Sequence, residues 1–274
     1  MEEREMIRKL MKEVEGYLDR GVCIAFSGGV DSSLLLKAAC MSAKEHGVEA
    51  PYAVTFETRL HPHSDTEEAK ETAKEFGARH AVIQIDEFQD ERIRKNPVDR
   101  CYLCKKLLFT DLKEFAGKAH CQVLMDGSNY DDTKVYRPGM RALKEMGVIS
   151  PLMDLRLTKQ QVRNMALALG IKASSKPSTP CMATRLPYGT EFDYELLDRI
   201  HQAETFIRGL GFYNVRLRLH GQIGRIEIDK ERFAEFLDRR EEVIARLKEL
   251  GFIYITCLLY TSFLFFLPCR QRVN

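Results

Sequence analysis

The stretch CIAFSGGVDSSLLLKAAC, residues 23–40, passes from a short apolar run through two glycines into a helical pattern. The N-terminus of a helix carries unpaired N–H groups and a partial positive charge, so it stabilises an anion placed there. Gly28 and Gly29 let the backbone close around such an anion without side-chain clashes. Asp31 can cap the helix or help to hold Mg²⁺. The hydroxyl donors of the loop are Ser27, Ser32 and Ser33.

The loop lacks the lysine that a Walker-type phosphate loop places after its glycines. Taken alone, an ordinary strand–helix turn accounts for two glycines and an aspartate equally well, because these residues also satisfy turn geometry. The surrounding pattern therefore has to show whether the loop binds a ligand.

Short apolar runs alternate with longer helical patterns around this loop. This alternation predicts an α/β fold in which a parallel sheet carries helices on both faces. Such sheets bind ligands at the carboxyl ends of their strands, where SGGVDSS, TFETR and DGSNYDD all fall. We therefore expect Thr55 and Gly127, together with Asp126, Asn129, Asp131 and Asp132, to lie at the ligand crevice. The apolar runs are VCIAFS (22–27), AVTF (53–56), HAVIQI (80–85) and QVLMDG (122–127).

The pattern changes after about residue 185, where a helix–strand–strand–helix–strand series begins. This series predicts a small α+β domain, built on an antiparallel sheet, over residues 186–256. The first domain then spans residues 1–185, and SSKPSTPCMATRLPYGT (174–190) forms the linker. Residues 257–274 do not fit either pattern. CLLYTS, which opens this segment, resembles read-through of a sequencing adapter, so we interpret 257–274 as a non-native tail.

Composition excludes several classes of protein. A net charge of +2 gives the whole chain no reason to bind nucleic acid or an anionic membrane. The opening MEEREMIRKLMKEVEGYL is an amphipathic pattern rather than a signal peptide, which favours the cytoplasm. The apolar run at 252–267 is shorter than the roughly 20 residues that a membrane-spanning helix needs, so we expect no membrane anchor.

Three of the eight cysteines stand out by their context. Cys101 and Cys104 form a C-x₂-C pair in NPVDRCYLCKKLLF, and Cys181 lies in the loop KPSTPCMATRLPYG. A structural zinc would need remote ligands, because no second such pair is present. A redox disulfide within the pair is an alternative, and so is a 4Fe–4S cluster held by all three thiolates. Spacing alone does not choose among these sites.

The complete string SGGVDSS after an apolar strand resembles the PP-loop of the ATP pyrophosphatase superfamily. That resemblance implies cleavage of ATP between the α and β phosphates and adenylation of a substrate, and it accounts for the missing lysine. NPVDRCYLCKKLLF (96–109), DGSNYDDTKVYRPGMRALKEMGVISPL (126–152) and KPSTPCMATRLPYG (176–189) further resemble the LarE family, over about residues 5–256. These proteins convert carboxylates of pyridinium-3,5-biscarboxylic acid mononucleotide into thiocarboxylates during biosynthesis of a nickel-pincer nucleotide, the cofactor of lactate racemase.

The LarE resemblance implies two routes for sulfur. Some members donate the sulfur of the loop cysteine, here Cys181, and are left with dehydroalanine. Others carry three cysteines and a 4Fe–4S cluster that holds an extra sulfide. Because Cys101, Cys104 and Cys181 are all present, we favour the cluster-dependent branch, with ATP and Mg²⁺ as the other cofactors.

The resemblance also assigns the remaining site residues and partners. The ATP-binding residues are Ser27, Gly28, Gly29, Asp31, Ser32, Ser33, Thr55, Asp126 and Gly127. The residues expected to form the site for the substrate phosphate are Arg185, Arg216, Arg218 and Glu204. We expect a homo-oligomer that hands its product to a nickel-inserting enzyme. Two other functions remain open at this point: a PP-loop tRNA thiolase with an iron–sulfur cluster, and a nucleotide-binding or structural zinc protein without catalysis.

Overall fold

The computed structural model describes residues 2–61, 63–175 and 180–258. The chain forms two compact units. Among the described residues, the first unit comprises 2–87 and 99–175, and the second comprises 88–98 and 180–258. None of the helices in these ranges is both long and apolar enough to cross a bilayer. The tail interpreted as non-native lies outside the described residues from position 259 onward.

The first unit is built on a four-stranded parallel sheet in the order β3-β2-β1-β4. Each strand lies within or across one of the apolar runs noted in the sequence, which confirms the predicted parallel sheet with helices on its faces. The strands are β1 (Val22–Ala25), β2 (Tyr52–Thr58), β3 (Arg79–Ile85) and β4 (Val123–Met125).

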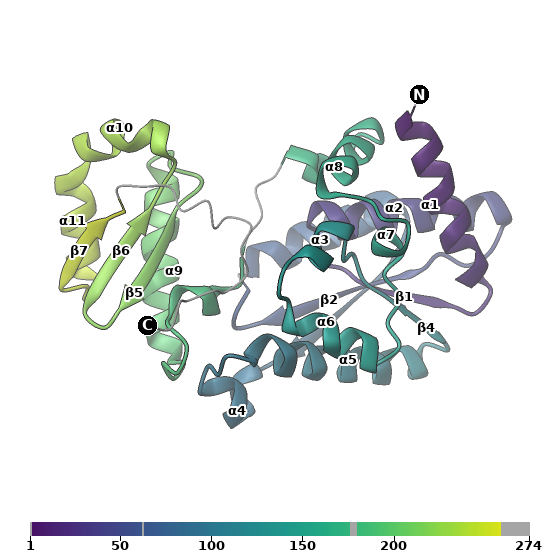
Figure 1. Cartoon of the computed structure of the whole chain (residues 1–274), viewed down its shortest axis with the longest axis horizontal. Helices are drawn as coiled ribbons and strands as arrows, with labels where there is room; N and C mark the ends of the chain where they lie inside the picture. The colour runs from purple at the N-terminus through teal and green to yellow at the C-terminus, as the bar shows by residue number, and fades with distance from the viewer. Residues whose placement is uncertain (1, 62, 176–179, 259–274) are drawn as a thin grey trace. The chain divides into compact units, whose positions relative to one another are not determined.

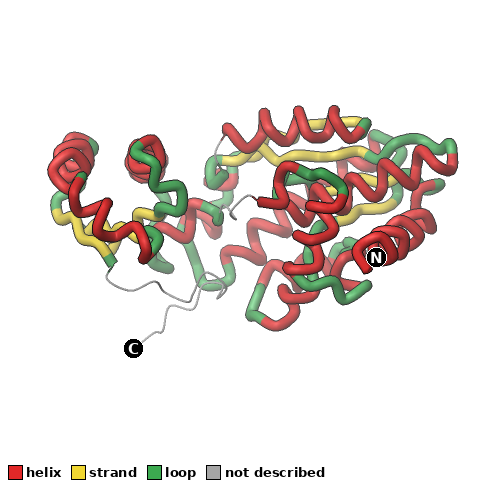
Figure 2. The backbone as a smooth tube through the Cα atoms, turned by 90° about the horizontal axis from the view of Figure 1, so that it is seen from above, coloured by secondary structure: helices red, strands yellow, loops and turns green. Residues whose placement is uncertain are grey.

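Helices cover both faces of this sheet (Figures 1 and 2). Side chains of β1 alternate between the faces: Ile24 packs in the core with α1, α2, α3 and α8, whereas Cys23 packs with α5 and α6. Burial on both faces is typical of a parallel sheet. The helices are α1 (Glu2–Leu18), α2 (Val30–His46), α3 (His63–Phe76), α5 (Arg100–Lys118), α6 (Pro138–Glu145), α7 (Pro151–Asp154), α8 (Lys159–Ala168), η2 (Tyr130–Lys134) and η3 (Lys172–Ser175).

The strand order places a switch point between β1 and β4. The chain runs from β1 outward through β2 to β3 and then returns to the other side of β1 to form β4. Loops that leave the carboxyl ends of two such neighbouring strands diverge and leave room for a ligand. Topology alone therefore selects the loops after β1 and β4 as the candidate site.

The second unit contains a three-stranded sheet in the order β5-β6-β7. Strands β5 and β6 form the predicted antiparallel hairpin, but β7 pairs parallel to β6, so the sheet is mixed. The second helix of the predicted series is broken near Arg239 into two helices, which carry the chain across to the parallel strand. The elements are η4 (Met182–Arg185), α9 (Tyr194–Gly209), β5 (Arg216–His220), β6 (Ile223–Glu227), η5 (Lys230–Arg232), α10 (Phe233–Asp238), α11 (Arg240–Glu249) and β7 (Tyr254–Cys257).

Residues 88–98 belong to the second unit, although they precede Cys101 in the chain. The Phe88 ring stacks on Phe192 with centroids 5.3 Å apart. The buried Asn96 donates through its Nδ2 to the Pro187 carbonyl at 2.8 Å, and its own carbonyl accepts from the N–H of Gly189. These contacts join η1 (Glu87–Gln89) and α4 (Glu91–Arg94) to a unit whose other residues come from the second half of the chain.

Candidate active site

The loop between β1 and α2 is closed by its own hydroxyl groups. Ser32 Oγ accepts from the N–H of Ser27 at 3.3 Å and donates to the Gly29 carbonyl at 3.2 Å. Gly28 has a φ of +70°, in the left-handed region that favours glycine, and a Cβ there would touch Ala69 at 3.4 Å. We call residues 26–33 the phosphate loop, because the sequence predicted an anion site here.

Gly29 is the N-cap of α2 and has no side chain to cap the helix. The first-turn N–H groups therefore keep their capacity to bind an anion. Ser33, in the same turn, is fully buried, and its Oγ has no hydrogen-bond partner among the described residues. An unsatisfied buried hydroxyl is unfavourable by about 1–3 kcal/mol, so an oxygen atom of a ligand or a water would stabilise this turn.

The end of β4 meets the phosphate loop at Gly127. A Cβ built on this residue would lie 2.8 Å from the backbone nitrogen of Ser32 and 3.1 Å from the carbonyl carbon of Asp31. Only glycine permits that approach, because backbone atoms rather than flexible side-chain ends stand in the way. Gly127 therefore sets the distance between the two loops of the switch point.

Asp126 and Thr55 are buried at this end of the sheet, with partners inside the protein. Asp126 accepts from Ser150 Oγ and from Ser128 Oγ, both at 2.6 Å. Thr55 Oγ1 lies 3.0 Å from Nε2 of His80 on the neighbouring strand. The Asp126 side chain joins the end of β4 to Ser128 and Ser150, whereas the Thr55 side chain joins β2 to β3. Their assignment to ATP remains a prediction.

Asp31 forms a network that includes a lysine missed by the sequence analysis. Its Oδ1 accepts from Asn129 Nδ2 at 3.0 Å, and its Oδ2 pairs with Nζ of Lys159. Asp31 therefore points to the loop after β4 and to α8. The T-K-Q-Q pattern at 158–161 signals a helix start in the sequence, but nothing there places Lys159 beside a residue 128 positions away.

The two acids that follow Asn129 are also paired. Asp131 accepts from Lys134 Nζ at 2.7 Å, and this hydrogen bond lowers the pKa of its carboxyl group. Asp132 pairs with Arg137 at 3.0 Å, but burial raises the pKa of the Asp132 carboxyl group. Asn129 and Asp132 form a reciprocal capping box at the start of η2, which fixes the path of the chain after β4, and Asp131 accepts from the N–H of Lys159 in α8. The expected place of both acids at the ligand crevice remains a prediction.

Cys101 and Cys104 are half-buried in the first turn of α5. Residues three apart share one face of a helix, so the two thiols are placed as neighbouring ligands. The Arg100 guanidinium donates to Cys101 Sγ at 3.5 Å. No group of three or more His, Cys, Asp or Glu in the described parts of the chain is arranged around a metal ion. Cys101 and Cys104 are placed so that they could supply two ligands of a cluster, and a cluster held by all three cysteines remains a prediction.

In the second unit, Cys181 is half-buried at the N-cap of η4. Arg185 anchors this loop: its Nη1 donates to the Pro180 carbonyl at 3.2 Å, while Nε and Nη2 bind both oxygens of Glu204 at 2.7 and 2.9 Å. The Arg185 and Glu204 side chains are only 1% and 0% exposed. Glu204 Oε1 also accepts from the N–H of Leu217 at 2.9 Å, which ties the cysteine loop through α9 to β5.

Arginines outnumber their carboxylate partners around β5. Arg218 donates to Glu227 and to the Thr184 carbonyl, at 2.7 and 2.6 Å. Burial, reinforced by repulsion from Arg185 and Arg218, lowers the pKa of Arg216 to about 10. A cation destabilised in this way favours an incoming anion, which would relieve the repulsion. The predicted phosphate-binding arginines therefore form one cluster, in which Glu204 and Glu227 are the counter-ions.

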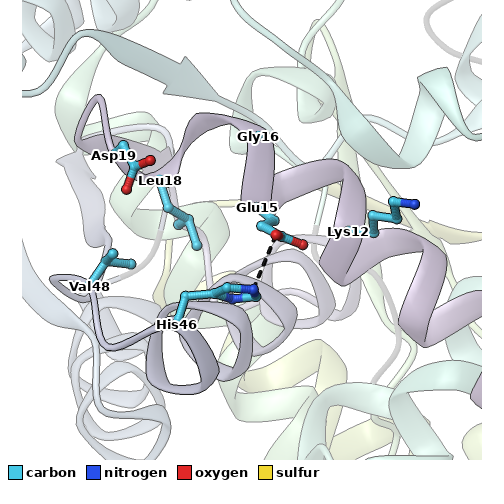
Figure 3. Close-up of a pocket in the computed structure, with 7 residues that line it drawn as sticks. All are labelled: Lys12, Glu15, Gly16, Leu18, Asp19, His46 and Val48. Carbon is cyan, nitrogen blue, oxygen red and sulfur yellow. Dashed lines mark ion pairs between the residues drawn. The ribbon is translucent and has the colours of Figure 1, made fainter.

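A separate pocket between α1 and the end of α2 does not belong to these sites (Figure 3). Its lining includes Glu15 and His46, whose side chains pair at 3.1 Å. Because α2 has 17 residues, His46 lies about 24 Å along the helix from the phosphate loop.

The switch-point position, the glycine-rich loop without a lysine and the uncapped helix start together define a nucleotide-binding domain of the PP-loop class. A family model described as a PP-loop domain matches residues 2–134. The chain is 34% identical over 86% of its length to the pyridinium-3,5-bisthiocarboxylic acid mononucleotide synthase of Lactiplantibacillus plantarum, of which it covers 84%. It is 35% identical to an uncharacterised protein of Synechocystis, over 90% of this chain and 91% of that one. An NH(3)-dependent NAD(+) synthetase of Staphylothermus marinus is 29% identical over 66% of each chain.

The chain belongs to the LarE family, whose member from Lactiplantibacillus plantarum is the synthase just described. It is an ATP-dependent sulfurtransferase that adenylates its substrate. This outcome confirms the family predicted from the phosphate loop and the cysteine-bearing stretches.

Proposed function

We propose that this protein converts the carboxylates of pyridinium-3,5-biscarboxylic acid mononucleotide into thiocarboxylates for a nickel-pincer nucleotide. The observation that carries the proposal is the joint presence of two sites in a LarE family chain. The first unit holds a phosphate loop for ATP, and the second holds a thiol on a loop anchored beside an arginine cluster. The substrate combines a carboxylate to be activated with a phosphate to be bound, so it needs both sites.

Adenylation is the first step. A substrate carboxylate oxygen attacks the α-phosphorus of ATP, the bond to the bridging oxygen breaks, and pyrophosphate leaves. The first-turn N–H groups of α2 and the loop hydroxyls would bind phosphate oxygens, and Asp31 would help to hold Mg²⁺, which when bound supplies neutralisation of part of the phosphate charge. The carboxylate oxygen, a poor leaving group, thereby becomes part of AMP, which departs readily.

Sulfur transfer is the second step. A sulfur nucleophile attacks the acyl carbon and AMP leaves, which yields the thiocarboxylate. If Cys181 itself is the donor, its thiolate forms a thioester as AMP leaves. Removal of the Cys181 Cα proton by a base then breaks the Cβ–S bond, which releases the thiocarboxylate and leaves dehydroalanine. We assign Arg185 and Glu204 to positioning the Cys181 loop, and Arg216 and Arg218 to binding the substrate phosphate.

We favour a donor that is not consumed. Cys101, Cys104 and Cys181 would hold a 4Fe–4S cluster, which when bound supplies one open iron that can carry the sulfide to be transferred. The placement of Cys101 and Cys104 on one helix face, beside the Arg100 guanidinium, supports this proposal for two of the three ligands. We also propose that the protein self-associates and hands its product to a nickel-inserting enzyme.

The test is anaerobic purification followed by iron and sulfide analysis and a pyrophosphate-release assay with the mononucleotide. We expect pyrophosphate release that depends on the mononucleotide, together with formation of the thiocarboxylate. Cys101→Ser should lose iron and thiocarboxylate formation together. Cys40→Ala is the matched control, because burial in the core raises the pKa of the Cys40 thiol to about 12 and makes it inert.

The mass of residue 181 after turnover separates the two sulfur routes. A protein without iron whose Cys181 becomes about 34 Da lighter has lost H₂S from that residue and uses the sacrificial route. Absence of pyrophosphate release with the mononucleotide, in a protein that binds ATP, would refute the proposed function itself.

A further inference from the structure

Two arginines on β5 and β6 share one oxygen of a single carboxylate. Arg218 Nε and Arg225 Nη2 both donate to Glu227 Oε1 at 2.7 Å. The two neighbouring strands place Arg218 and Arg225 directly opposite each other, an arrangement in which like charges repel (Figure 1). Because one carboxylate charge faces two guanidinium charges, a further anion would be stabilised beside this pair.

His220 adds an uncharged group to the same face of the sheet. It lies two positions along β5 from Arg218, so both side chains point to that face. Burial, reinforced by repulsion from Arg225 and Arg218, lowers the pKa of His220, so its imidazole is neutral near pH 7. Nε2 of His220 and Nε of Arg225 are buried, and neither has a hydrogen-bond partner among the described residues. Since the Nε of an arginine always carries a hydrogen, what Arg225 lacks there is an acceptor.

We propose that Arg225 and His220 form a second anion subsite, which binds the ring carboxylate of the mononucleotide that is not being activated. This inference rests on the proposed function, because it concerns the same substrate. A carboxylate supplies the acceptors that the two buried nitrogen atoms lack, and its charge would reduce the repulsion between the arginines. The Arg225 side chain is 30% exposed, so a change of rotamer can present its Nε to a ligand.

The chemistry of the substrate requires such a subsite. Its two carboxylates lie at positions 3 and 5 of the ring, which exchange when the ring makes a half-turn about its bond to ribose. While one carboxylate is activated, the other stays charged, and an anion taken from water without a partner is strongly destabilised. After the first sulfur transfer and a half-turn, the subsite would receive the thiocarboxylate, which is also an anion. The same donors therefore serve both rounds of the reaction.

The subsite adjoins the Cys181 loop and the strand proposed to bind phosphate. Arg218 Nη1 donates at 2.6 Å to the carbonyl of Thr184, in the short helix η4 whose N-cap is Cys181. Thr184 Oγ1 donates in turn to the Cys181 carbonyl at 2.8 Å. Arg216 begins β5 and His220 ends it, about 13 Å farther along at roughly 3.3 Å per residue. A mononucleotide can therefore bind through its phosphate at one end of the strand and through its ring carboxylate toward the other.

The experiment is calorimetric titration of the full chain with pyridinium-3,5-biscarboxylic acid mononucleotide, nicotinamide mononucleotide and inorganic phosphate. Each titration contains Mg²⁺ and α,β-methylene-ATP, an ATP analogue that releases no pyrophosphate. Nicotinamide mononucleotide has the same pyridinium, ribose and phosphate but no carboxylate. In Arg225→Met we expect binding of the dicarboxylate to weaken about 10- to 100-fold, the loss typical of a hydrogen bond to a charged group. The other two probes should bind as they do to the wild type.

Arg240→Met is the matched control. Arg240 is another arginine of the second unit that pairs with a glutamate, and its side chain is 64% exposed. All three probes should bind this variant with the affinities of the wild type.

Two variants of His220 test the imidazole separately. His220→Phe should weaken binding of the dicarboxylate several-fold, because it removes Nε2. His220→Gln places an amide donor near the same point and should restore most of the affinity. Unchanged affinity for the dicarboxylate in both Arg225→Met and His220→Phe would overturn the proposal. Equal loss of both nucleotides in Arg225→Met would also overturn it, because Arg225 would then act on the phosphate or on the fold.

Failure of the subsite and failure of the proposed function are distinguishable. If Arg225→Met does not fold, Arg225→Gln keeps a polar side chain beside Glu227 and is judged by the same ratio of dicarboxylate to nicotinamide mononucleotide affinity. A wild type that prefers the dicarboxylate but makes no thiocarboxylate would refute the proposed function, and the ratios in the variants would still decide the role of Arg225. A wild type that makes thiocarboxylate without such a preference would refute the subsite alone.

Discussion

Replacing Gly127 with alanine tests whether the close contact between the loop after β4 and the phosphate loop sets the geometry of the ATP site. The new Cβ would lie 2.8 Å from the backbone nitrogen of Ser32 and 3.0 Å from its Cα. Ordinary contacts of this kind begin at 3.4 Å, so the backbones have to separate by about 0.6 Å. Since the opposing atoms are backbone, no side chain can rotate away to make room.

Overpacking of this kind lowers the free energy of unfolding by about 1–3 kcal/mol. The displacement falls on the first turn of α2, whose N–H groups are proposed to bind phosphate. A shift approaching 1 Å in a reacting group can reduce a rate by about 100-fold. For a shift of about 0.6 Å we expect mononucleotide-dependent pyrophosphate release to fall at least tenfold in Gly127→Ala.

Pyrophosphate release and urea unfolding, measured side by side, separate the two effects. Gly117→Ala is the control: it also lies in the first unit, but in a helix with open space around the position, so it should leave the rate unchanged and stabilise α5 by about 0.5–1 kcal/mol. If Gly127→Ala kept the wild-type rate and the wild-type unfolding midpoint, the backbone contact would have no role in positioning the loop.

Other positions give sharper tests of single interactions. Glu204→Gln should lower the free energy of unfolding, measured in urea, by about 3–5 kcal/mol, because it leaves the buried Arg185 without its charged partner. The control Glu242→Gln breaks an exposed pair and should change the free energy of unfolding by no more than about 0.5 kcal/mol. Removal from solvent lowers the pKa of His61 to about 4, so the unfolded state binds more protons than the folded state between that value and about 6.5. The free energy of unfolding should therefore fall as the pH drops through this range, and it should fall less steeply in His61→Gln. The same pH dependence of unfolding in the variant and the wild type would contradict this. Asn129→Ala should weaken ATP-analogue binding several-fold in calorimetry by releasing Asp31, and full retention of affinity would show that the bond is dispensable.

The fold of the first unit could be predicted from the sequence because its signals are local. A buried parallel strand is a short apolar run. The helix after β1 has Gly29 as its N-cap and Gly47 as its C-cap, and Gly47, with a φ of +66°, closes the last turn. For Gly127, the sequence predicted only that the residue lies in the loop after a strand. The reason that only glycine fits there is the backbone of Ser32, which approaches from a different segment of the chain.

What the sequence left open depends on contacts between distant segments. Glu204 was assigned to the substrate phosphate, and the structure shows a carboxylate whose two oxygens already bind Arg185 and the Leu217 N–H. The composition of residues 88–98 does not distinguish them from the first domain. Phe88 and Asn96 nevertheless contact partners more than 90 positions away. No periodicity or motif encodes such pairings, because each partner is an ordinary residue in its own segment.

Two of the carboxylate–cation pairs in the described part of the chain, Asp31–Lys159 and Glu204–Arg185, are built alike but differ in burial. In both, a carboxylate holds a cation beside a loop and also accepts from a third group: Asp31 from Asn129, and Glu204 from the Leu217 N–H. Glu204 and Arg185 are almost completely excluded from water, and separating them would leave two buried charges, so Arg185 stays on Glu204 and acts on the Cys181 loop by holding it. Asp31 and Lys159 keep a fifth to a quarter of their surface in solvent, where the same separation costs far less. Burial therefore makes Arg185 a fixed part of the scaffold, whereas the Asp31–Lys159 pair can separate at a lower cost in free energy.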